Sequence, residues 1–285
     1  MKILVTGARG MLGSDLCPVI EAQGDEVIRV SRNDRRGFVQ FDLEDFEFVI
    51  ETFERITPDA VIHCAAWTDV DGCTRNPDEA RDQNAFATKA LSKVCAQFKI
   101  PLLYLSTDFV FDGDKSTPYH VDDYVEPLNH YGVSKLEGEE YVQKYCTKHF
   151  IVRTSWLFGV HGKCFPATML KLAEKKDSIS VVADQIGSPT HTLDLAKSLA
   201  WLIHRTEYGT YHISNSGSCS WYEFACKTFE IAGNTAVKVL PIPASENPSP
   251  TKRPAYSVLD NSKIEKLGFP LLQSWEEALV GYFLI

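Results

Sequence analysis

The chain has 285 residues and a formal net charge of −9, with 44% apolar and 24% charged residues. This length allows one large domain or two joined lobes, and the composition is ordinary for a soluble globular protein. The acidic charge argues against nucleic acid as a partner, because nucleic-acid-binding surfaces are usually basic. No apolar run approaches the ~20 residues that cross a bilayer, and the apolar start is too short for a signal peptide. We therefore expect a cytoplasmic protein that does not contact membranes.

The eight cysteines and eight histidines do not indicate a metal site. None of the cysteines forms a C-x-x-C pair, and no His/Cys cluster has the spacing of zinc ligands. We expect reduced thiols, several of them packed as small apolar side chains.

The most informative segment follows the first expected strand, at 2-6. It reads Gly7-Ala8-Arg9-Gly10-Met11-Leu12-Gly13 and opens an amphipathic helix expected at 11-22. Gly7 permits the sharp turn, Gly10 lets a pyrophosphate approach the backbone, and Gly13 lets the helix pack closely on the sheet. The helix N-terminus directs its free amides at this point. The pattern predicts a dinucleotide bound by this turn, with Arg9, Met11 and Leu12 among its contacts.

Expected strands and helices alternate through the first half of the chain. The strands lie at 26-30, 59-63, 102-106 and 150-154, and the helices at 45-56, 78-99 and 131-146. This alternation predicts an α/β fold with a Rossmann-type, doubly wound parallel sheet, whose ligand lies at the carboxyl ends of the strands. The second half is less regular, with helices expected at 166-176, 193-204 and 221-232, strands at 179-183, 210-213 and 236-241, and an ordered loop or flap at 242-254.

We expect two lobes. A dinucleotide-binding domain takes 1-155 plus about 190-215, and a smaller α/β substrate-binding lobe takes about 156-189 plus 216-285.

Ser31 and Arg32 follow the second expected strand, where an NAD-selective site carries an acidic residue for the ribose diol. Arg32, with Arg9, has the planar fork that pairs with a 2′-phosphate, which favours NADPH, with NADH as the alternative. The competing interpretation is a solvated cluster of Arg32, Arg35 and Arg36, and Asp34 weakens the phosphate assignment. Asp42, next to Leu43, either contacts the adenine or caps the following helix.

Two further strand ends and one helix start carry candidate residues. Cys64, Ala65 and Ala66 follow the strand at 59-63, and their small side chains allow the cofactor to approach. Ser106, Thr107 and Asp108 follow the strand at 102-106. Tyr131 and Lys135 open the next helix, where residues four apart share one face.

In this order, the glycine turn, Ser106-Thr107 and Tyr131-x-x-x-Lys135 resemble the extended short-chain dehydrogenase/reductases. The strings Ser106-Thr107-Asp108-Phe109-Val110-Phe111-Asp112-Gly113, Arg153-Thr154-Ser155-Trp156 and Asp184-Gln185-Ile186-Gly187-Ser188-Pro189-Thr190 are similar to the dTDP-4-dehydrorhamnose reductase family. The resemblance implies an oxidoreductase that makes dTDP-L-rhamnose from the 4-keto nucleotide sugar with NADPH or NADH, for surface polysaccharide.

The resemblance also implies residue roles. Tyr131 donates the proton, and Lys135 binds the nicotinamide ribose and lowers the tyrosine pKa, together with the positive nicotinamide ring. Thr107 positions the keto group, with Ser106 as the alternative; each hydroxyl also has the simpler role of a strand-end cap. Asn84 lies by the cofactor, or is a buried Asn bonded to backbone.

On the substrate side, the expected contacts are Thr68, Asp69, Val70, Asp108, Trp156, Gln185 and Arg253. Trp156 packs against the deoxysugar or belongs to the core. Gln185 and Arg253 are assigned to the diphosphate, because an anion in an acidic protein needs a paired cation.

Some relatives pair through acidic residues that share a divalent metal. Asp15 matches one such ligand, but Leu193 stands where another acidic residue is expected. We therefore expect no metal and a monomer or weak homodimer. Two alternatives stay open: an epimerase or dehydratase that retains its NAD, and a non-catalytic regulatory subunit.

Overall fold

A parallel sheet of seven strands forms the centre of the protein. The computed structural model describes residues 1–32, 36–43, 45–247, 249 and 251–284. Neighbouring strands follow the order β11 (Gly209–His212), β6 (His149–Thr154), β5 (Leu102–Thr107), β4 (Ala60–His63), β1 (Lys2–Thr6), β2 (Glu26–Ser31) and β3 (Val39–Gln40). All of these pairs are parallel. The order 3-2-1-4-5-6 is that of doubly wound dinucleotide folds, so the predicted fold class is confirmed.

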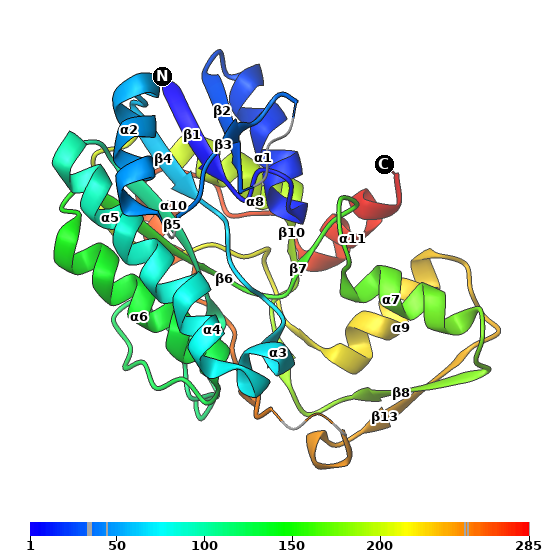
Figure 1. Ribbon diagram of the computed structural model, residues 1–285. Helices are drawn as coiled ribbons and strands as arrows, with labels where there is room; N and C mark the ends of the chain where they lie inside the picture. The colour runs from blue at the N-terminus through cyan, green and yellow to red at the C-terminus, as the bar shows by residue number, and fades with distance from the viewer. Residues whose placement is uncertain (33–35, 44, 248, 250, 285) are drawn as a thin grey trace.

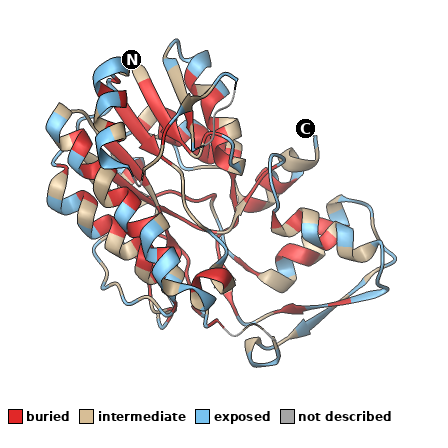
Figure 2. Cartoon of the chain, in the orientation of Figure 1, coloured by how far each residue is buried: buried red, intermediate tan, exposed pale blue. Residues whose placement is uncertain are grey.

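Helices cover both faces of this sheet (Figure 1). On one face lie α1 (Met11–Ala22) and α8 (Thr192–Leu202), and on the other α2 (Phe46–Ile56), α5 (Ala87–Phe98) and α6 (His130–Tyr145). Alternate strand residues serve the two cores: Ile3 and Val5 pack with Leu16 and Leu199, whereas Leu4 packs in the core that holds Phe53. The sheet is therefore buried on both sides (Figure 2).

A smaller set of elements lies beside the carboxyl end of the sheet (Figure 1). It comprises α7 (Phe165–Ala173), α9 (Trp221–Ile231), α11 (Trp275–Leu284) and the parallel pair β8 (Ser178–Val182) and β13 (Lys238–Ile242). Their apolar side chains form separate clusters around Phe224 and Phe229. Because α8 and β11 belong to the sheet layer while these elements do not, we propose the two-lobe division expected from the sequence.

Short elements join the two parts. Strand β7 (Leu157–Phe158) pairs with β10 (Thr190–His191), and β9 (Ile186–Gly187) pairs with β12 (Cys219–Ser220). The residues after β13 form a single 3-10 turn, Ala244–Glu246, within the loop expected at 242-254. Helix α10 (Ser262–Lys266) buries Ile264 against the α1 and α8 side of the sheet.

Several elements differ from the sequence expectation, among them strand β3 and helix α10, which were not expected. The helix expected at 78-99 is interrupted: α4 (Pro77–Arg81) passes through a π-helical turn, Asp82–Phe86, into α5. A further helix, α3 (Val70–Arg75), lies where none was expected; Asp69 caps it by accepting a hydrogen bond from the Gly72 amide at 3.0 Å. Among the described residues, no helix combines the length and apolar character that a bilayer crossing demands.

Candidate active site

The glycine turn has the backbone geometry that a bound pyrophosphate requires. Gly7 has φ +66°, and a Cβ there would lie 2.7 Å from the Ala65 amide nitrogen. A Cβ on Gly13 would lie 2.3 Å from the Gly7 carbonyl oxygen. Helix α1 starts after Gly10 with no side-chain cap, which leaves its first amides for an anion. The turn therefore fits a dinucleotide.

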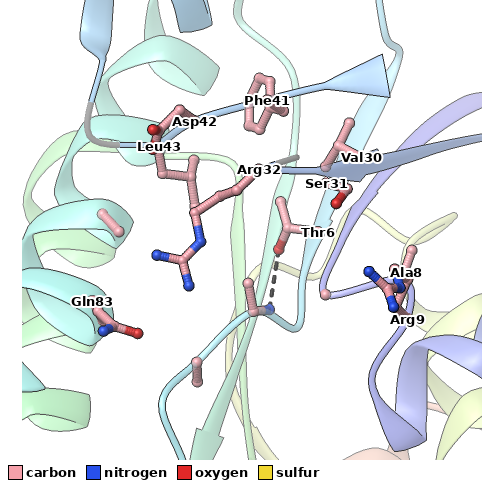
Figure 3. Close-up of a pocket in the computed structure, with 14 residues that line it drawn as sticks. Thr6, Ala8, Arg9, Val30, Ser31, Arg32, Phe41, Asp42, Leu43 and Gln83 are labelled. Carbon is pink, nitrogen blue, oxygen red and sulfur yellow. Dashed lines mark hydrogen bonds between the residues drawn. The ribbon is translucent and has the colours of Figure 1, made fainter. Parts of the chain in front are cut away.

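A cavity of about 270 Å³ lies beside this turn, between β1, β2 and the start of α5 (Figure 3). Its lining includes the expected residues Gly7, Arg9, Ser31, Arg32, Asp42, Leu43, Ala65 and Ala66, together with Gln83, which sequence reasoning missed. The Arg32 guanidinium points towards Gln83, and Arg9 lies on the far side of Ser31 (Figure 3). This end of the crevice suits the adenosine half of the cofactor.

The choice between an NADPH and an NADH site depends on the end of β2. Ser31 ends the strand, and among the described residues Asp42 is the one acidic side chain that lines this cavity. Helix α2 is capped by Asp45, which accepts a hydrogen bond from the Phe48 amide at 3.0 Å, so the expectation that Asp42 caps this helix is wrong. The alternative was a solvated arginine cluster, and one of its members, Arg36, is exposed. Arg35 and the neighbouring Asp34 lie outside the described residues.

A buried histidine supports the loop after β4, which lies beside the glycine turn. Thr88 donates its hydroxyl to the Asn84 carbonyl at 2.6 Å, so it accepts from His63 Nε2 at 3.1 Å. His63 Nδ1 then accepts from Thr6 at 2.6 Å, and the Thr6 oxygen accepts from the Ala65 amide at 3.1 Å. Burial, with a smaller effect of the Lys135 charge, lowers the pKa of His63 to about 3 and keeps it neutral. The network fixes the loop after β4.

A second cavity, of about 450 Å³, continues from the glycine turn to the ends of β5 and β6. Thr107, Tyr131 and Lys135 all line it, together with Gly10, Met11, Leu12, Gly13 and Cys64. Tyr131 reaches Thr107 because α6 begins very close to the turn after β5: a Cβ on Gly132 would lie 2.2 Å from the Phe109 carbonyl oxygen. The three residues with catalytic chemistry thus meet in one cavity with the glycine turn.

The electrostatics of this cavity are dominated by burial. Burial raises the pKa of Tyr131, and the Asp108 charge adds to this effect, whereas a hydrogen bond with Thr107 opposes it. Burial also lowers the pKa of Lys135 to about 7, and Glu139 and Cys64 counteract part of the effect. The expected lowering of the tyrosine pKa by Lys135 is therefore not produced by the protein's own groups, because desolvation outweighs them.

Ser106 and Thr107 are distinguished by their partners. Ser106 donates its hydroxyl to Glu139, which also forms a buried ion pair with Arg153 at 2.7 Å. Thr107 accepts from the Phe109 amide at 3.2 Å and donates to Asp108 Oδ1 at 3.1 Å. The Ser106 hydroxyl is bound to a buried ion pair, whereas the partner of Thr107, Asp108, itself lines the cavity, so Thr107 is the better placed to contact a substrate.

Two tryptophans line the side of the crevice where the substrate is expected. Trp156 stacks on Trp221 with ring centroids 3.5 Å apart and planes 6° apart. Trp156 holds φ +48°, an unusual backbone conformation for a bulky residue. Its ring covers Gly187, where a Cβ would lie 2.4 Å from the indole. Trp156 lines the catalytic cavity, as expected for a substrate contact, and it also packs against its neighbours.

A third cavity, of about 530 Å³, opens outward from the tryptophans. Its lining includes the expected residues Thr68, Asp69, Val70, Trp156 and Arg253. Arg253 pairs with Asp71 at 3.1 Å and donates to the Ser249 hydroxyl at 2.6 Å. Lys163 supplies a second cation. Sequence reasoning missed Asp71, Lys163 and Trp221 as lining residues, although it predicted the helix that starts at Trp221 after the Ser220–Glu223 capping box.

Two expected contacts are not brought to these cavities. Asn84 is buried, and its amide group pairs with both backbone polar atoms of Trp67, at 2.7 and 3.1 Å, and with Ser134 at 3.0 Å. This is the backbone-bonded alternative considered from the sequence. Gln185 is buried beside β9 and lines none of the three cavities.

Asp15, the candidate metal ligand, contacts two side chains. Thr192 donates to it, and His161 lies 3.4 Å from its other oxygen. Within the described part of the chain, no three His, Cys, Asp or Glu side chains gather as a metal site would require.

The glycine turn forms a site that fits a dinucleotide, and the adjoining cavity brings together a threonine, a tyrosine and the lysine four residues after that tyrosine. This combination defines a short-chain dehydrogenase/reductase. The comparisons with known proteins narrow this class. Residues 1–283 match the family described as the RmlD substrate binding domain, and the chain belongs to that family.

Two curated relatives cover nearly the whole chain. The spore coat polysaccharide biosynthesis protein SpsK of Bacillus subtilis is 40% identical, over 99% of this chain and 96% of its own length. The dTDP-4-dehydrorhamnose reductase of Mycolicibacterium smegmatis is 38% identical, over 98% of this chain and 84% of its own length. Among solved structures, the dTDP-4-dehydrorhamnose reductase of Bacillus anthracis in complex with NADP is 38% identical, with a TM-score of 0.94, and covers 99% of this chain and 98% of that one.

These relatives confirm the resemblance seen in the sequence. They also confirm the expected enzyme class, an oxidoreductase, and the expected coenzyme, NADP.

Proposed function

We propose that the protein uses NADPH to reduce the 4-keto group of dTDP-4-dehydrorhamnose, forming dTDP-L-rhamnose. The observation that carries the proposal is the meeting of Thr107, Tyr131 and Lys135 in one cavity with the glycine turn. We infer the identity of the nucleotide sugar from the relatives, which are named as dTDP-4-dehydrorhamnose reductases. Polysaccharide synthesis is the pathway that such a product supplies.

The proposed chemistry divides between the coenzyme and the protein. NADPH, when bound, supplies a hydride for the carbonyl carbon. Tyr131 donates the proton that the carbonyl oxygen needs, and the hydroxyl of Thr107, oriented by the Phe109 amide, holds that oxygen. Lys135 is buried on the same face of α6 and favours the phenolate that remains after the transfer.

The nucleotide end of the substrate is assigned to the outer cavity. Arg253 and Lys163 are the two cations among its lining residues, and a diphosphate in a protein of net charge −9 needs such groups. The ion pair with Asp71 fixes the guanidinium of Arg253 in place. Trp156, between this cavity and Tyr131, is placed to pack against the deoxysugar.

At the adenosine end, Arg32 is assigned to the 2′-phosphate because β2 ends in Ser31 and not in an acidic residue, although Asp42 also lines this cavity. We further propose that the protein acts in the cytoplasm, as a monomer or weak homodimer without nucleic acid.

The test is a reaction with a defined product. Purified protein is incubated with NADPH and dTDP-4-dehydrorhamnose, NADPH oxidation is followed by absorbance, and the sugar is identified by NMR. The proposal predicts one NADPH consumed for each dTDP-L-rhamnose formed. A nucleotide sugar changed without net consumption of NADPH would instead indicate an epimerase or dehydratase.

A further inference from the structure

Helix α6 carries three ionisable side chains along one face. Tyr131, Lys135 and Glu139 are spaced four residues apart, so they follow one another on the same side of the helix. The tyrosine and the lysine line the catalytic cavity, whereas Glu139 does not. Lys135 is 2% exposed and Glu139 1% exposed. The proposed chemistry uses the first two residues and gives the buried glutamate no role, although burial of a charge is costly without partners.

The carboxylate of Glu139 is bound by two neighbouring strands. Arg153, on β6, donates from Nη2 to Oε2 at 2.7 Å and from Nε to Oε1 at 3.0 Å, the two-bond geometry of a strong arginine–carboxylate pair. Ser106, on β5, donates its hydroxyl to Oε1. Because Ser106 and Arg153 are register partners in the sheet, Glu139 joins α6 to the ends of both strands.

Lys135 is attached to the adjacent residue of the same strand. Its ammonium group donates to the carbonyl of Leu105, the residue directly before Ser106, and Thr107 follows Ser106 directly. Three consecutive residues of β5 are thus bound to Lys135, bound to Glu139 and assigned to the keto oxygen. A change at Glu139 therefore acts on a strand that places both Lys135 and Thr107.

The negative charge of Glu139 also acts on the ammonium group itself. Burial lowers the pKa of Lys135 to about 7, and of the groups that counteract this effect Glu139 is the stronger and Cys64 the weaker. An opposite charge beside a buried ammonium group favours its charged form. Only the charged form of Lys135 can stabilise a phenolate on Tyr131.

Few other groups near Lys135 supply a negative charge. Burial lowers the pKa of His63, on β4, to about 3, and raises that of the Cys64 thiol to about 12, so both are neutral near pH 7. Burial also raises the pKa values of the two neighbouring tyrosines, Tyr104 on β5 and Tyr131. Asp108 lines the same cavity, but burial raises its pKa to about 7, so it is only partly charged there. The paired carboxylate of Glu139 therefore supplies the main counter-charge.

We propose that Glu139 is a positioning residue for the reduction: it supplies the buried counter-charge of Lys135 and, through Ser106, fixes the end of β5 that carries Thr107. The roles of Lys135 and Thr107 rest on the proposed function. The effect of Glu139 on the lysine does not depend on the substrate.

The first experiment follows the titration of Lys135 in the free protein. Lysine labelled with ¹³C at Cε is incorporated, and NMR identifies the Lys135 signal by its loss in Lys135→Met. Glu139→Gln removes the charge and keeps the shape, and it is expected to lower the titration midpoint of Lys135 by about one pH unit. Glu139→Asp keeps the charge and is expected to hold the midpoint closer to the wild-type value. The matched control is Glu140→Gln, at the next, exposed position of α6, which is expected to leave the midpoint unchanged.

The second experiment measures turnover against pH, with NADPH and dTDP-4-dehydrorhamnose. Both Tyr131 and Lys135 act in their protonated forms, and the lysine loses its proton first, because burial raises the pKa of Tyr131 and lowers that of Lys135. The alkaline limb of the profile is therefore expected to move to lower pH in Glu139→Gln and to recover in Glu139→Asp.

A midpoint and an alkaline limb that both stay at their wild-type pH in Glu139→Gln would overturn the proposal, and a loss of stability alone would leave Glu139 a structural residue. Glu139→Gln leaves Arg153 as an unpaired buried charge; if this variant does not fold, the double variant Glu139→Gln with Arg153→Met removes both charges, and a shift in the same direction is expected. A wild-type protein whose lysine midpoint shifts as expected in Glu139→Gln, but which does not reduce the keto sugar, would reject the proposed function alone.

Discussion

The ammonium group of Lys135 donates a hydrogen bond to the carbonyl oxygen of Leu105, at 2.7 Å. The same nitrogen lies 4.1 Å from the centre of the Tyr104 ring. Both partners belong to β5, the strand that ends in Thr107. Two of the residues to which we assign catalytic roles are thus joined through the backbone, and the strand that places the threonine also places the lysine.

Burial of Lys135 predicts a specific pH dependence of stability. Its pKa is lowered from 10.5 to about 7, so between these values the folded protein binds fewer protons than the unfolded chain. The free energy of unfolding therefore rises with pH across that window, and the lysine's cost is fully present below pH 7. Urea denaturation of wild type and Lys135→Met at several pH values measures the difference. A difference that does not vary between pH 7 and 10.5 would contradict the lowered pKa of Lys135.

Tyr131→Phe is expected to reduce turnover by about a hundredfold or more, the contribution of a positioned acid, and to leave NADPH affinity within a few-fold. Steady-state kinetics and NADPH titration measure the two quantities. The control is Tyr145→Phe, at the end of the same helix and away from the cavities described here. Near-normal turnover in Tyr131→Phe would eliminate the assigned acid.

Arg32→Ala is expected to raise the Michaelis constant for NADPH about tenfold and that for NADH much less, because only NADPH carries the phosphate that the guanidinium pairs with. The matched control is Arg36→Ala, an exposed arginine outside the cavity lining. Equal effects of Arg32→Ala on the two coenzymes would show that Arg32 does not bind the phosphate and belongs to a solvated arginine cluster.

Arg253→Ala is expected to weaken dTDP binding about tenfold, through loss of a charge-assisted contact to the diphosphate. Calorimetry with dTDP measures this affinity in the wild type and the variant. Arg75→Ala is the control, since Arg75 is also an arginine near an aspartate of this region, 3.5 Å from Asp69, but does not line the outer cavity. Unchanged dTDP affinity in Arg253→Ala would reject the contact and leave the arginine as a partner of Asp71 only.

The sequence predicted what depends on local geometry. The glycine turn, the strand ends and the Tyr131–Lys135 spacing each require particular residue types at fixed separations, and the expected strands and long helices fall within a few residues of the observed ones. Thr107 and Tyr131 could be paired from sequence because Thr107 ends β5, and the helix that follows a parallel strand begins at the same edge of the sheet.

What the sequence did not predict depends on contacts between distant segments. Trp221 meets Trp156 only because α9 packs across the crevice, and Asp71 meets Arg253 across 182 positions of chain. The spacing of apolar residues along the helix does not reveal the π-helical turn. This turn nevertheless holds Asn84 against Trp67. Helix α3 was missed because it has only six residues, one of them Gly72.

The most direct test traces the hydrogen that NADPH transfers to the sugar. NADPH deuterated at the transferred position of its nicotinamide is incubated with the protein and dTDP-4-dehydrorhamnose, and the product is examined by NMR and mass spectrometry. We predict one deuterium at C4 of the hexose for each NADPH oxidised. Deuterium that stays on the coenzyme while the sugar is altered would contradict the assignment of Thr107, Tyr131 and Lys135 to a net reduction.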